Sequence, residues 1–191
     1  MDCFILAGGQ SRRFGGDKLL HRLGGKSTIE YVLETAEQVC DRVHLVVKES
    51  GKFKHLGVPT IEDALPFQSP AVGVYTALLN SGSGEVLVLA GDMPLLNPQV
   101  LRLLMERYAP PVTLFSIRGK LYPLTAVYSR ELLGDLKDFL SSGGRSLVGF
   151  LKKLPYTTLT ETDVTPIDPE LKSFLNMNTR EDLTNLMEML A

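Results

Sequence analysis

Glycines and basic side chains are concentrated in one short segment near the start of the chain. A short apolar run, Cys3 to Leu6, leads directly into Ala7-Gly8-Gly9-Gln10-Ser11-Arg12-Arg13-Phe14-Gly15-Gly16-Asp17-Lys18. Glycines let a backbone approach a polyphosphate closely and turn its N–H groups toward the oxygens. Arginine and lysine side chains can neutralise charge that develops in a transition state. The segment therefore predicts a phosphate-binding loop, with contacts expected at Leu6, Ala7, Gly8, Gly9, Arg12, Arg13, Gly15 and Lys18.

Two common phosphate-binding motifs do not describe this loop. No Gly-Lys-Ser/Thr follows at the spacing of a Walker A motif, and Gly-x-Gly-x-x-Gly does not fit residues 8–13. An ordinary strand-to-helix turn with surface arginines is the simpler alternative. Two arginines, a second Gly-Gly pair and an Asp-Lys pair in the same loop favour phosphate binding.

Two aspartates follow predicted strands. Asp92 lies just beyond the apolar run Glu85–Ala90, and Asp63 follows Val58–Ile61. In open α/β sheets, ligands bind beyond the carboxyl ends of the strands, and a carboxylate there can hold Mg²⁺ together with nucleotide phosphates. We expect Asp92 to be the metal ligand, with a turn cap as the alternative. Asp63 is expected to accept hydrogen bonds from a ribose or a base, with an Asx-turn as the alternative.

Four further positions are candidates for ligand contacts. Gly73 opens a predicted helix after Pro70, where a nucleobase could pack against backbone; a plain packing glycine is equally compatible. Arg145 follows Gly143-Gly144 and is a candidate for the phosphate of a second substrate, or a surface arginine. Asn176 and Asn178 are two residues apart, so in an extended segment they share a face. A turn at the entry of a helix explains the same pair without a ligand.

Apolar patterning predicts the elements that position these residues. Continuous apolar runs, typical of strands in a sheet covered on both faces, occur at 3–6, 43–47, 58–61 and 85–90. Helices are expected at 28–39, opened by the capping box Ser27–Glu30, at 71–79, and from Asn97 with Pro98 at the first helical position. The second half predicts strands at 113–116 and 121–128 with a turn at Gly119, and helices at 131–140, 146–151 and from Thr179 to about 190. Alternating strands and helices indicate an α/β protein of three layers, α/β/α, with a mostly parallel sheet.

Length and composition exclude several classes of protein. The 191 residues contain no linker-like stretch and are expected to form one domain, with a nucleotide-binding half at 1–108 and a substrate half at 109–191. A net charge of −2 gives no global basic field for nucleic acid, and no apolar stretch approaches the roughly 20 residues of a membrane span. The two cysteines form no C-x-x-C motif, which favours the cytoplasm. His21, His44 and His55 are isolated and belong to no recognisable catalytic constellation.

The order Leu6-Ala7-Gly8-Gly9-x-Ser11-x-Arg13-x-Gly15-x-Asp17-Lys18 resembles the signature of the molybdenum cofactor guanylyltransferases. Phe14 stands where this family usually has methionine. Three further matches follow in the family's order: Ile61-Glu62-Asp63 with Ser69-Pro70-Ala71-Val72-Gly73, then Gly91-Asp92-Met93-Pro94, then Asn176-Met177-Asn178-Thr179. Ser69 replaces a glycine of the family pattern. The resemblance spans nearly the whole chain and implies a Rossmann-like nucleotidyltransferase fold.

This resemblance implies a reaction and a role for each matched residue. GTP and Mg²⁺ would bind the front half and molybdopterin, carrying its metal, the back half; its terminal phosphate would attack the α-phosphorus of GTP and release pyrophosphate. Arg12 and Arg13 would bind the β- and γ-phosphates, Lys18 the α-phosphate, and Asp92 the Mg²⁺, which makes Lys18, Arg13 and Asp92 the catalytic set. Asn176 and Asn178 would bind the pterin or complete the metal shell. Cofactor-delivery proteins and molybdoenzymes are the implied protein partners.

Related functions remain as alternatives. A sibling enzyme would use CTP with the same pterin, or a sugar or polyol phosphate with another nucleotide. The Leu-Ala-Gly-Gly start favours the guanylyl branch, because cytidylyl relatives tend to have Leu-Ala-Ala-Gly. A non-catalytic nucleotide-binding module is a further alternative. Such a module has no need for a metal carboxylate and Lys18 together, so their joint presence argues for catalysis.

Overall fold

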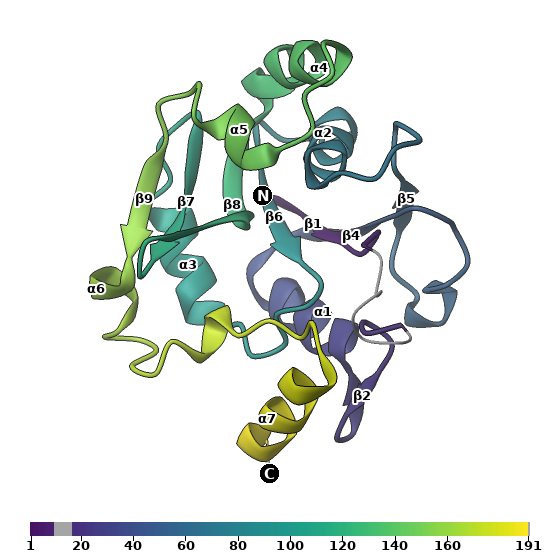
Figure 1. Ribbon diagram of the computed structural model, residues 1–191, viewed down its shortest axis with the longest axis vertical. Helices are drawn as coiled ribbons and strands as arrows, with labels where there is room; N and C mark the ends of the chain where they lie inside the picture. Colours follow the sequence, from purple (N-terminus) through teal and green to yellow (C-terminus); the bar gives the residue numbers. More distant parts are fainter. Residues whose placement is uncertain (10–16, 191) are drawn as a thin grey trace.

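One seven-stranded β-sheet runs through the centre of the molecule (Figure 1). The computed structural model describes residues 1–9 and 17–190. In spatial order the strands are β5 (Thr60–Glu62), β4 (Arg42–Val47), β1 (Asp2–Leu6), β6 (Glu85–Ala90), β8 (Lys120–Ser129), β7 (Val112–Ile117) and β9 (Thr157–Thr160). Neighbouring strands are parallel, except that β8 is antiparallel to both β6 and β7. The predicted α/β class with a mostly parallel sheet is therefore confirmed.

Helices cover both faces of this sheet, which gives the three predicted layers (Figure 1). They are α1 (Thr28–Val39) and α3 (Pro98–Glu106) on one face, and α2 (Pro70–Asn80), α4 (Leu133–Ser141) and α5 (Leu147–Leu151) on the other. Successive residues of a strand point to opposite faces. Accordingly, Ile5 packs with Ile29 and Leu101 in one core, whereas Phe4 packs with Val72 in the other.

The helices begin where their capping residues predict. Ser27 and Glu30 form the capping box of α1, with the Ser27 N–H donating to Glu30 Oε2 at 2.6 Å. Ser69 caps α2, and Asn97 caps α3 with its side-chain oxygen accepting from the Gln99 N–H at 2.8 Å. The last helix, α7 (Arg180–Leu190), is preceded by Thr179, whose N–H donates to Asp182 Oδ2 at 2.9 Å. These helix starts are thus determined by local sequence.

Short elements are where sequence and structure differ. The structure adds a hairpin of β2 (Arg22–Leu23) and β3 (Lys26–Ser27), strand β9, helix α6 (Glu161–Val164) and the single turns η1 (Lys54–Leu56), η2 (Arg130–Leu132) and η3 (Lys172–Phe174). Elements of two to four residues are too short for hydrophobic periodicity to identify them. The strand predicted at 58–61 begins later, at Thr60: the Pro59 carbonyl accepts from the Leu45 N–H at 2.9 Å, but proline has no N–H to donate. The helix predicted at 131–140 is divided between η2 and α4.

Strands β1, β4, β5 and β6 run in one direction, so the residues that follow them meet at one edge of the sheet. Backbone hydrogen bonds continue the ladder beyond the strands. The Ala7 N–H donates to the Val46 carbonyl at 2.8 Å, the Asp63 N–H to the Val47 carbonyl at 2.8 Å and the Gly91 N–H to the Leu6 carbonyl at 3.2 Å. The start of the glycine loop, Asp63 and Asp92 are held together in this way.

The segment before α7 reaches the same edge from the far end of the chain. The Met177 N–H donates to the Asp92 carbonyl at 2.7 Å, and the Met177 side chain is fully buried with Leu23, Leu183 and Leu186. Both halves of the chain thus contribute to one sheet and to one edge of it. Within residues 1–9 and 17–190, no helix has the length and apolar character needed to cross a bilayer.

Candidate active site

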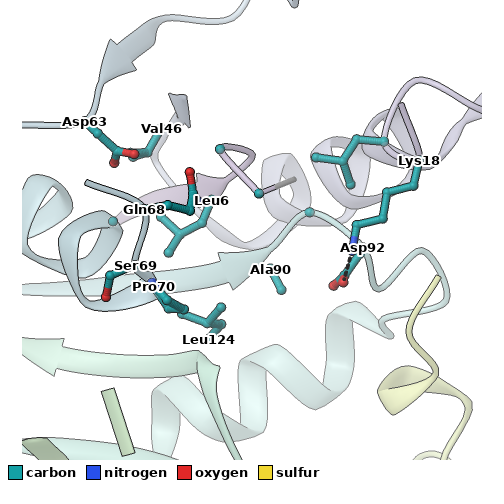
Figure 2. Close-up of a pocket in the computed structure, with 15 residues that line it drawn as sticks. Leu6, Lys18, Val46, Asp63, Gln68, Ser69, Pro70, Ala90, Asp92 and Leu124 are labelled. Atoms are coloured by element: carbon teal, nitrogen blue, oxygen red, sulfur yellow. Dashed lines mark hydrogen bonds and ion pairs between the residues drawn. The ribbon is translucent and has the colours of Figure 1, made fainter. Parts of the chain in front are cut away.

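A cleft opens at the carboxyl edge of the parallel strands (Figure 2). The ends of β1 and β6, the segment between β5 and α2, the first turn of α2 and the end of the glycine loop line it. The lining residues are Leu6, Gly8, Gly9, Lys18, Leu19, Val46, Asp63, Gln68, Ser69, Pro70, Gly73, Ala90, Gly91, Asp92 and Leu124. Seven of the residues that the sequence predicts as ligand contacts therefore lie around one cavity. They are Leu6, Gly8, Gly9, Lys18, Asp63, Gly73 and Asp92.

Lys18 is the centre of a polar cluster at one end of the cleft. Its Nζ lies 3.0 Å from Asp92 Oδ2 and donates to Asn178 Oδ1 at 2.8 Å. Figure 2 shows the Lys18 and Asp92 side chains pointing toward one another. The three side chains come from the glycine loop, the end of β6 and the segment before α7, so three distant parts of the chain meet at one ammonium group.

Local contacts fix both ends of this cluster. Asp17 accepts a hydrogen bond from the Leu19 N–H at 3.1 Å and forms an ion pair with Lys52, which anchors the residue next to Lys18. On the opposite side, the Met177–Asp92 backbone bond keeps Asn178 beside the end of β6. The cluster is therefore assembled by tertiary structure before any ligand arrives.

Two glycines line the cleft at places where a larger residue would collide. A Cβ on Gly73 would lie 2.7 Å from Leu6 Cδ1, closer than side chains pack. A Cβ on Gly8 would lie 3.3 Å from Asp63 Oδ2 and 3.4 Å from the Lys48 backbone nitrogen. The side of each glycine on which a Cβ would stand is therefore filled by neighbouring protein atoms, so both glycines allow close packing around the cleft.

Asp63 lies at the other end of the cleft, in an ion pair that the sequence analysis does not contain. Its Oδ2 is 3.2 Å from Lys48 Nζ, whereas its Oδ1 is buried and has no hydrogen-bond partner among the described residues. Burial raises the pKa of Asp63, and the neighbouring Lys48 ammonium opposes that rise. A buried acceptor without a donor is costly unless a ligand satisfies it.

Ser69 and Arg145 are connected to one another. Ser69 Oγ accepts from the Ala71 N–H at 3.1 Å and donates to the Arg145 carbonyl at 2.6 Å. The Arg145 guanidinium lies over the Phe67 ring, 3.6 Å from its centroid, and donates to the carbonyls of Leu140 and Gly144. The structure thus gives Arg145 the contacts of a residue that holds the segment before α2.

The remaining predicted residues are placed as follows. Arg12, Arg13 and Gly15 lie outside the described residues. Asn178 joins the Lys18 cluster, whereas Asn176 lines a separate hollow along α7 together with Asp182 and Leu186. The structure thus does not bring the two amides to one site. Ala7 is buried at the start of the loop.

Sequence reasoning missed Lys48, Gln68 and Leu124. Gln68 and Leu124 line the cleft, and Lys48 contacts Asp63. Lys48 directly follows the strand predicted at 43–47, and Asp63 and Asp92 lie two residues beyond theirs, so the position of Lys48 offered a similar signal. Gln68 and Leu124 offered no signal, because one lies in a loop and the other reads as an ordinary strand residue.

The donor set around Lys18 fits a hard divalent cation. Asp92 Oδ2 and Asn178 Oδ1 both contact one positive group, the Lys18 ammonium, and carboxylate and amide oxygens are the ligands that Mg²⁺ prefers. Residues 1–9 and 17–190 contain no cluster of three or more acidic, histidine or cysteine side chains that could hold a metal alone. A metal here would take its other ligands from substrate phosphates and water, the usual mode for Mg²⁺.

A parallel sheet whose carboxyl edge carries a glycine loop, a lysine and a carboxylate is the architecture of an α/β enzyme that handles nucleotides. The family model of the MobA-like NTP transferase domain matches residues 3–155. The chain belongs to this family and is a nucleotidyltransferase.

Relatives and solved structures extend this similarity over the full length. The chain is 37% identical to a probable molybdenum cofactor guanylyltransferase from Aquifex aeolicus, covering 97% of this chain and 89% of the relative. It is 36% identical to a probable molybdenum cofactor guanylyltransferase from Thermococcus kodakarensis, over 95% and 92% of the two chains. Its fold is similar to that of molybdopterin-guanine dinucleotide biosynthesis protein A from Archaeoglobus fulgidus, with a TM-score of 0.87, 27% identity and coverage of 100% and 98%.

Proposed function

We propose that this protein transfers GMP from GTP to the molybdenum cofactor, forming the guanine dinucleotide form of the cofactor and releasing pyrophosphate. The single observation that carries the proposal is the Lys18–Asp92–Asn178 cluster beside the glycine loop. It combines a cation for a phosphate, a carboxylate for a metal and an amide from the C-terminal segment. The names of the similar relatives supply the identity of the substrates.

The reaction is a displacement at phosphorus. A terminal phosphate oxygen of molybdopterin forms a bond to the α-phosphorus of GTP, and the bond from that phosphorus to the bridging oxygen of pyrophosphate breaks. A phosphate monoester is already ionised at neutral pH, so the attacking oxygen needs no strong general base. The protein contributes positioning and neutralisation of charge, the two effects on which phosphoryl-type transfer depends.

Each residue of the cluster has a distinct task. Lys18 donates to the α-phosphate as its charge is redistributed, and this contact strengthens in the transition state. Gly8 and Gly9 offer backbone N–H groups to the β- and γ-phosphates, and we assign Arg12, Arg13 and Gly15 to the same phosphates. Asp92, with Asn178, would hold Mg²⁺, which supplies Lewis-acid charge stabilisation when bound.

The two ends of the cleft separate the two parts of GTP. The phosphates would lie at Lys18, and the nucleoside would extend past Leu6 toward Gly73 and Asp63, which line the cleft and where Asp63 Oδ1 has no donor among the described residues. Residues 1–108 would thus form the nucleotide half of a single domain, and residues 109–191 the half that receives molybdopterin. Asn176 is assigned to the pterin side, whereas Arg145 supports the segment before α2 on the nucleoside side.

The cellular context belongs to the same proposal. We place the protein in the cytoplasm, where its free cysteines, Cys3 and Cys40, stay reduced. Proteins that deliver the cofactor and molybdoenzymes that receive it are the expected partners, because the dinucleotide product is useful only when inserted.

Pyrophosphate release tests the reaction and the choice of nucleotide together. The protein is incubated with Mg²⁺ and each of the four nucleoside triphosphates, with and without molybdopterin. Release from GTP that requires molybdopterin is the expected result. Release from CTP instead would identify a cytidylyltransferase, and binding without release from any triphosphate would identify a non-catalytic module.

A further inference from the structure

We infer that Lys48 is a positioning residue for the nucleotide, holding Asp63 and the segment 64–68 in the arrangement that receives the nucleoside. This inference rests on the proposed function only in that the cleft must bind a nucleotide. Lys48 belongs to no motif of the sequence analysis, and its role follows from where strand β4 ends.

The topology places Lys48 between two parts of the cleft. Strand β4 lies between β1 and β5, and all three run in the same direction. The residue after β4 therefore stands between the residues after β1, which begin the glycine loop, and Asp63, which follows β5. Gly8 packs directly against Lys48: a Cβ on Gly8 would lie 3.4 Å from the Lys48 backbone nitrogen and 3.6 Å from its Cγ.

The ammonium group of Lys48 reaches three oxygens on the nucleoside side. Its Nζ donates to the Phe67 carbonyl at 2.7 Å and the Leu65 carbonyl at 3.4 Å, and lies 3.2 Å from Asp63 Oδ2. A lysine ammonium has three donors, so one side chain can satisfy all three acceptors. Lys48 therefore determines both the position of segment 64–68 and the orientation of the Asp63 carboxylate.

The orientation of the Asp63 carboxylate matters because only one of its two oxygens has a partner within residues 1–9 and 17–190. With Oδ2 on Lys48, Oδ1 is left buried, lacking any donor in the described part of the chain, in a side chain that is only 8% exposed. An ionised carboxylate is an acceptor-only group, so it fits the N–H or O–H donors of a nucleoside. Burial raises the pKa of the Asp63 carboxyl, and the Lys48 ammonium counters this effect because its opposite charge favours the ionised form.

A surface ion pair of the same chain shows what a merely structural lysine looks like. Lys26 lies 2.6 Å from Glu34, but both side chains are about half exposed and neither lines the cleft. Exposed pairs of this kind contribute little to stability. The Lys48–Asp63 pair differs because its carboxylate is buried and borders the cleft.

Nucleotide binding tests the inference separately from catalysis. The dissociation constant of each nucleoside triphosphate is measured by calorimetry for the wild type, Lys48→Met, Lys48→Gln and the control Lys54→Met, an exposed lysine of η1. We expect Lys48→Met to weaken binding of the preferred nucleotide by roughly tenfold or more, the scale of a lost charged hydrogen bond. Lys54→Met should bind as the wild type does. Lys48→Gln keeps amide donors for the backbone carbonyls, so it is the variant to use should Lys48→Met not fold.

The pH dependence distinguishes positioning from simple loss of structure. Lys48 is the charged neighbour that acts on Asp63 among the described residues, and Thr76 Oγ1 of α2 is its other polar neighbour. Protonation of Asp63 removes the acceptor, so affinity falls as the pH decreases through its pKa. Without Lys48 that pKa is higher, and the loss of affinity in Lys48→Met and Lys48→Gln should begin at a higher pH than in the wild type.

A double-variant comparison completes the test. In an Asp63→Asn background the further change Lys48→Met should cost less affinity than in the wild type, because the two residues act as one unit. Wild-type affinity and an unshifted pH profile in the Lys48 variants would overturn the inference and leave the proposed reaction standing. If Lys48→Met weakens nucleotide binding as expected but pyrophosphate is never released in a molybdopterin-dependent way, the proposed reaction is overturned and the inference about Lys48 stands. Absence of binding by any triphosphate would overturn both.

Discussion

Two lysine–aspartate pairs stand at the same edge of the sheet and differ in what surrounds them. In the Lys18–Asp92 pair the side chains are 16% and 18% exposed, and the ammonium has a second partner in the Asn178 side chain. In the Lys48–Asp63 pair the lysine is 28% and the aspartate 8% exposed, and the ammonium also holds two backbone carbonyls. Lys18 contacts the side chains of Asp92 and Asn178, whereas Lys48 contacts two backbone carbonyls in addition to the Asp63 side chain.

This difference indicates opposite behaviour when substrate arrives. Phosphate and Mg²⁺ can compete for Lys18 and Asp92, because each attracts the charge of opposite sign, so we expect the first pair to open. The partners of Lys48 are fixed by the sheet and by the loop before α2, so the second pair should persist. Under the proposed function, the same two residue types would serve as a reacting centre in one place and as a support in the other.

The largest effect is expected from Asp92→Asn, which removes the charge that would hold Mg²⁺ while keeping the shape of the side chain. We expect kcat for pyrophosphate release to fall by about 10³-fold, the order of effect produced by loss of electrostatic transition-state stabilisation. Initial rates over a range of Mg²⁺ concentrations measure it. Asp135→Asn, at an exposed position in the first turn of α4, is the matched control. Full activity in Asp92→Asn would place the metal elsewhere.

A smaller loss is expected from Lys18→Met. In the proposed reaction, the contact between Lys18 and the α-phosphate would strengthen only as charge is redistributed, so kcat should fall by about 10²-fold while the KM for GTP changes much less. Steady-state kinetics with GTP and molybdopterin measure both constants. Lys26→Met removes a lysine from a surface ion pair and should change neither. Near-normal turnover in Lys18→Met would contradict the assigned role and would make the first pair a support like the second.

Local signals in the sequence predicted most of the fold. The structure confirms the helix starts predicted at Ser27 with Glu30, at Asn97 with Pro98 and at Thr179, because each is determined by a few residues of local sequence. Strand β9 could not be predicted, because three threonines around Leu159 give a short edge strand that carries no continuous apolar run.

The candidate site was predictable where a residue type is placed at the end of a strand, and much less so elsewhere. Asp92 and Asp63 followed apolar runs and were found at the cleft. The partners of their side chains could not be predicted, because Lys18, Asn178 and Lys48 reach them only through tertiary packing. Arg145 illustrates the reverse case: a glycine-flanked arginine suggested a phosphate contact, and the structure places it over the Phe67 ring.

The smallest effect is expected from Asp63→Asn, which removes the buried charge of the second pair. Burial raises the pKa of Asp63 above the ordinary aspartate value of 3.8. At pH values between the ordinary pKa of the unfolded chain and the raised pKa of the folded chain, the folded chain binds more protons. The free energy of unfolding of the wild type therefore decreases as the pH rises through this range. Asparagine does not titrate. The stability of Asp63→Asn relative to the wild type should therefore increase with pH, by at most about 1.4 kcal/mol per unit of pKa difference.

Urea unfolding at a series of pH values measures this effect, and Asp41→Asn provides a control of opposite sign. The N-terminal amino group lowers the pKa of Asp41. Its carboxylate therefore stabilises the fold at pH values above the ordinary aspartate pKa, and this contribution is lost as the pH falls toward the lowered pKa. Asp41→Asn should therefore lose stability relative to the wild type as the pH rises, where Asp63→Asn gains it. A constant difference between Asp63→Asn and the wild type at every pH would mean that the pKa of Asp63 is the same in the folded and the unfolded chain. Burial of the Asp63 carboxylate would then carry no net free-energy cost that a nucleotide donor could offset. The two lysine–aspartate pairs would differ only in their exposure and in the partners of their lysines.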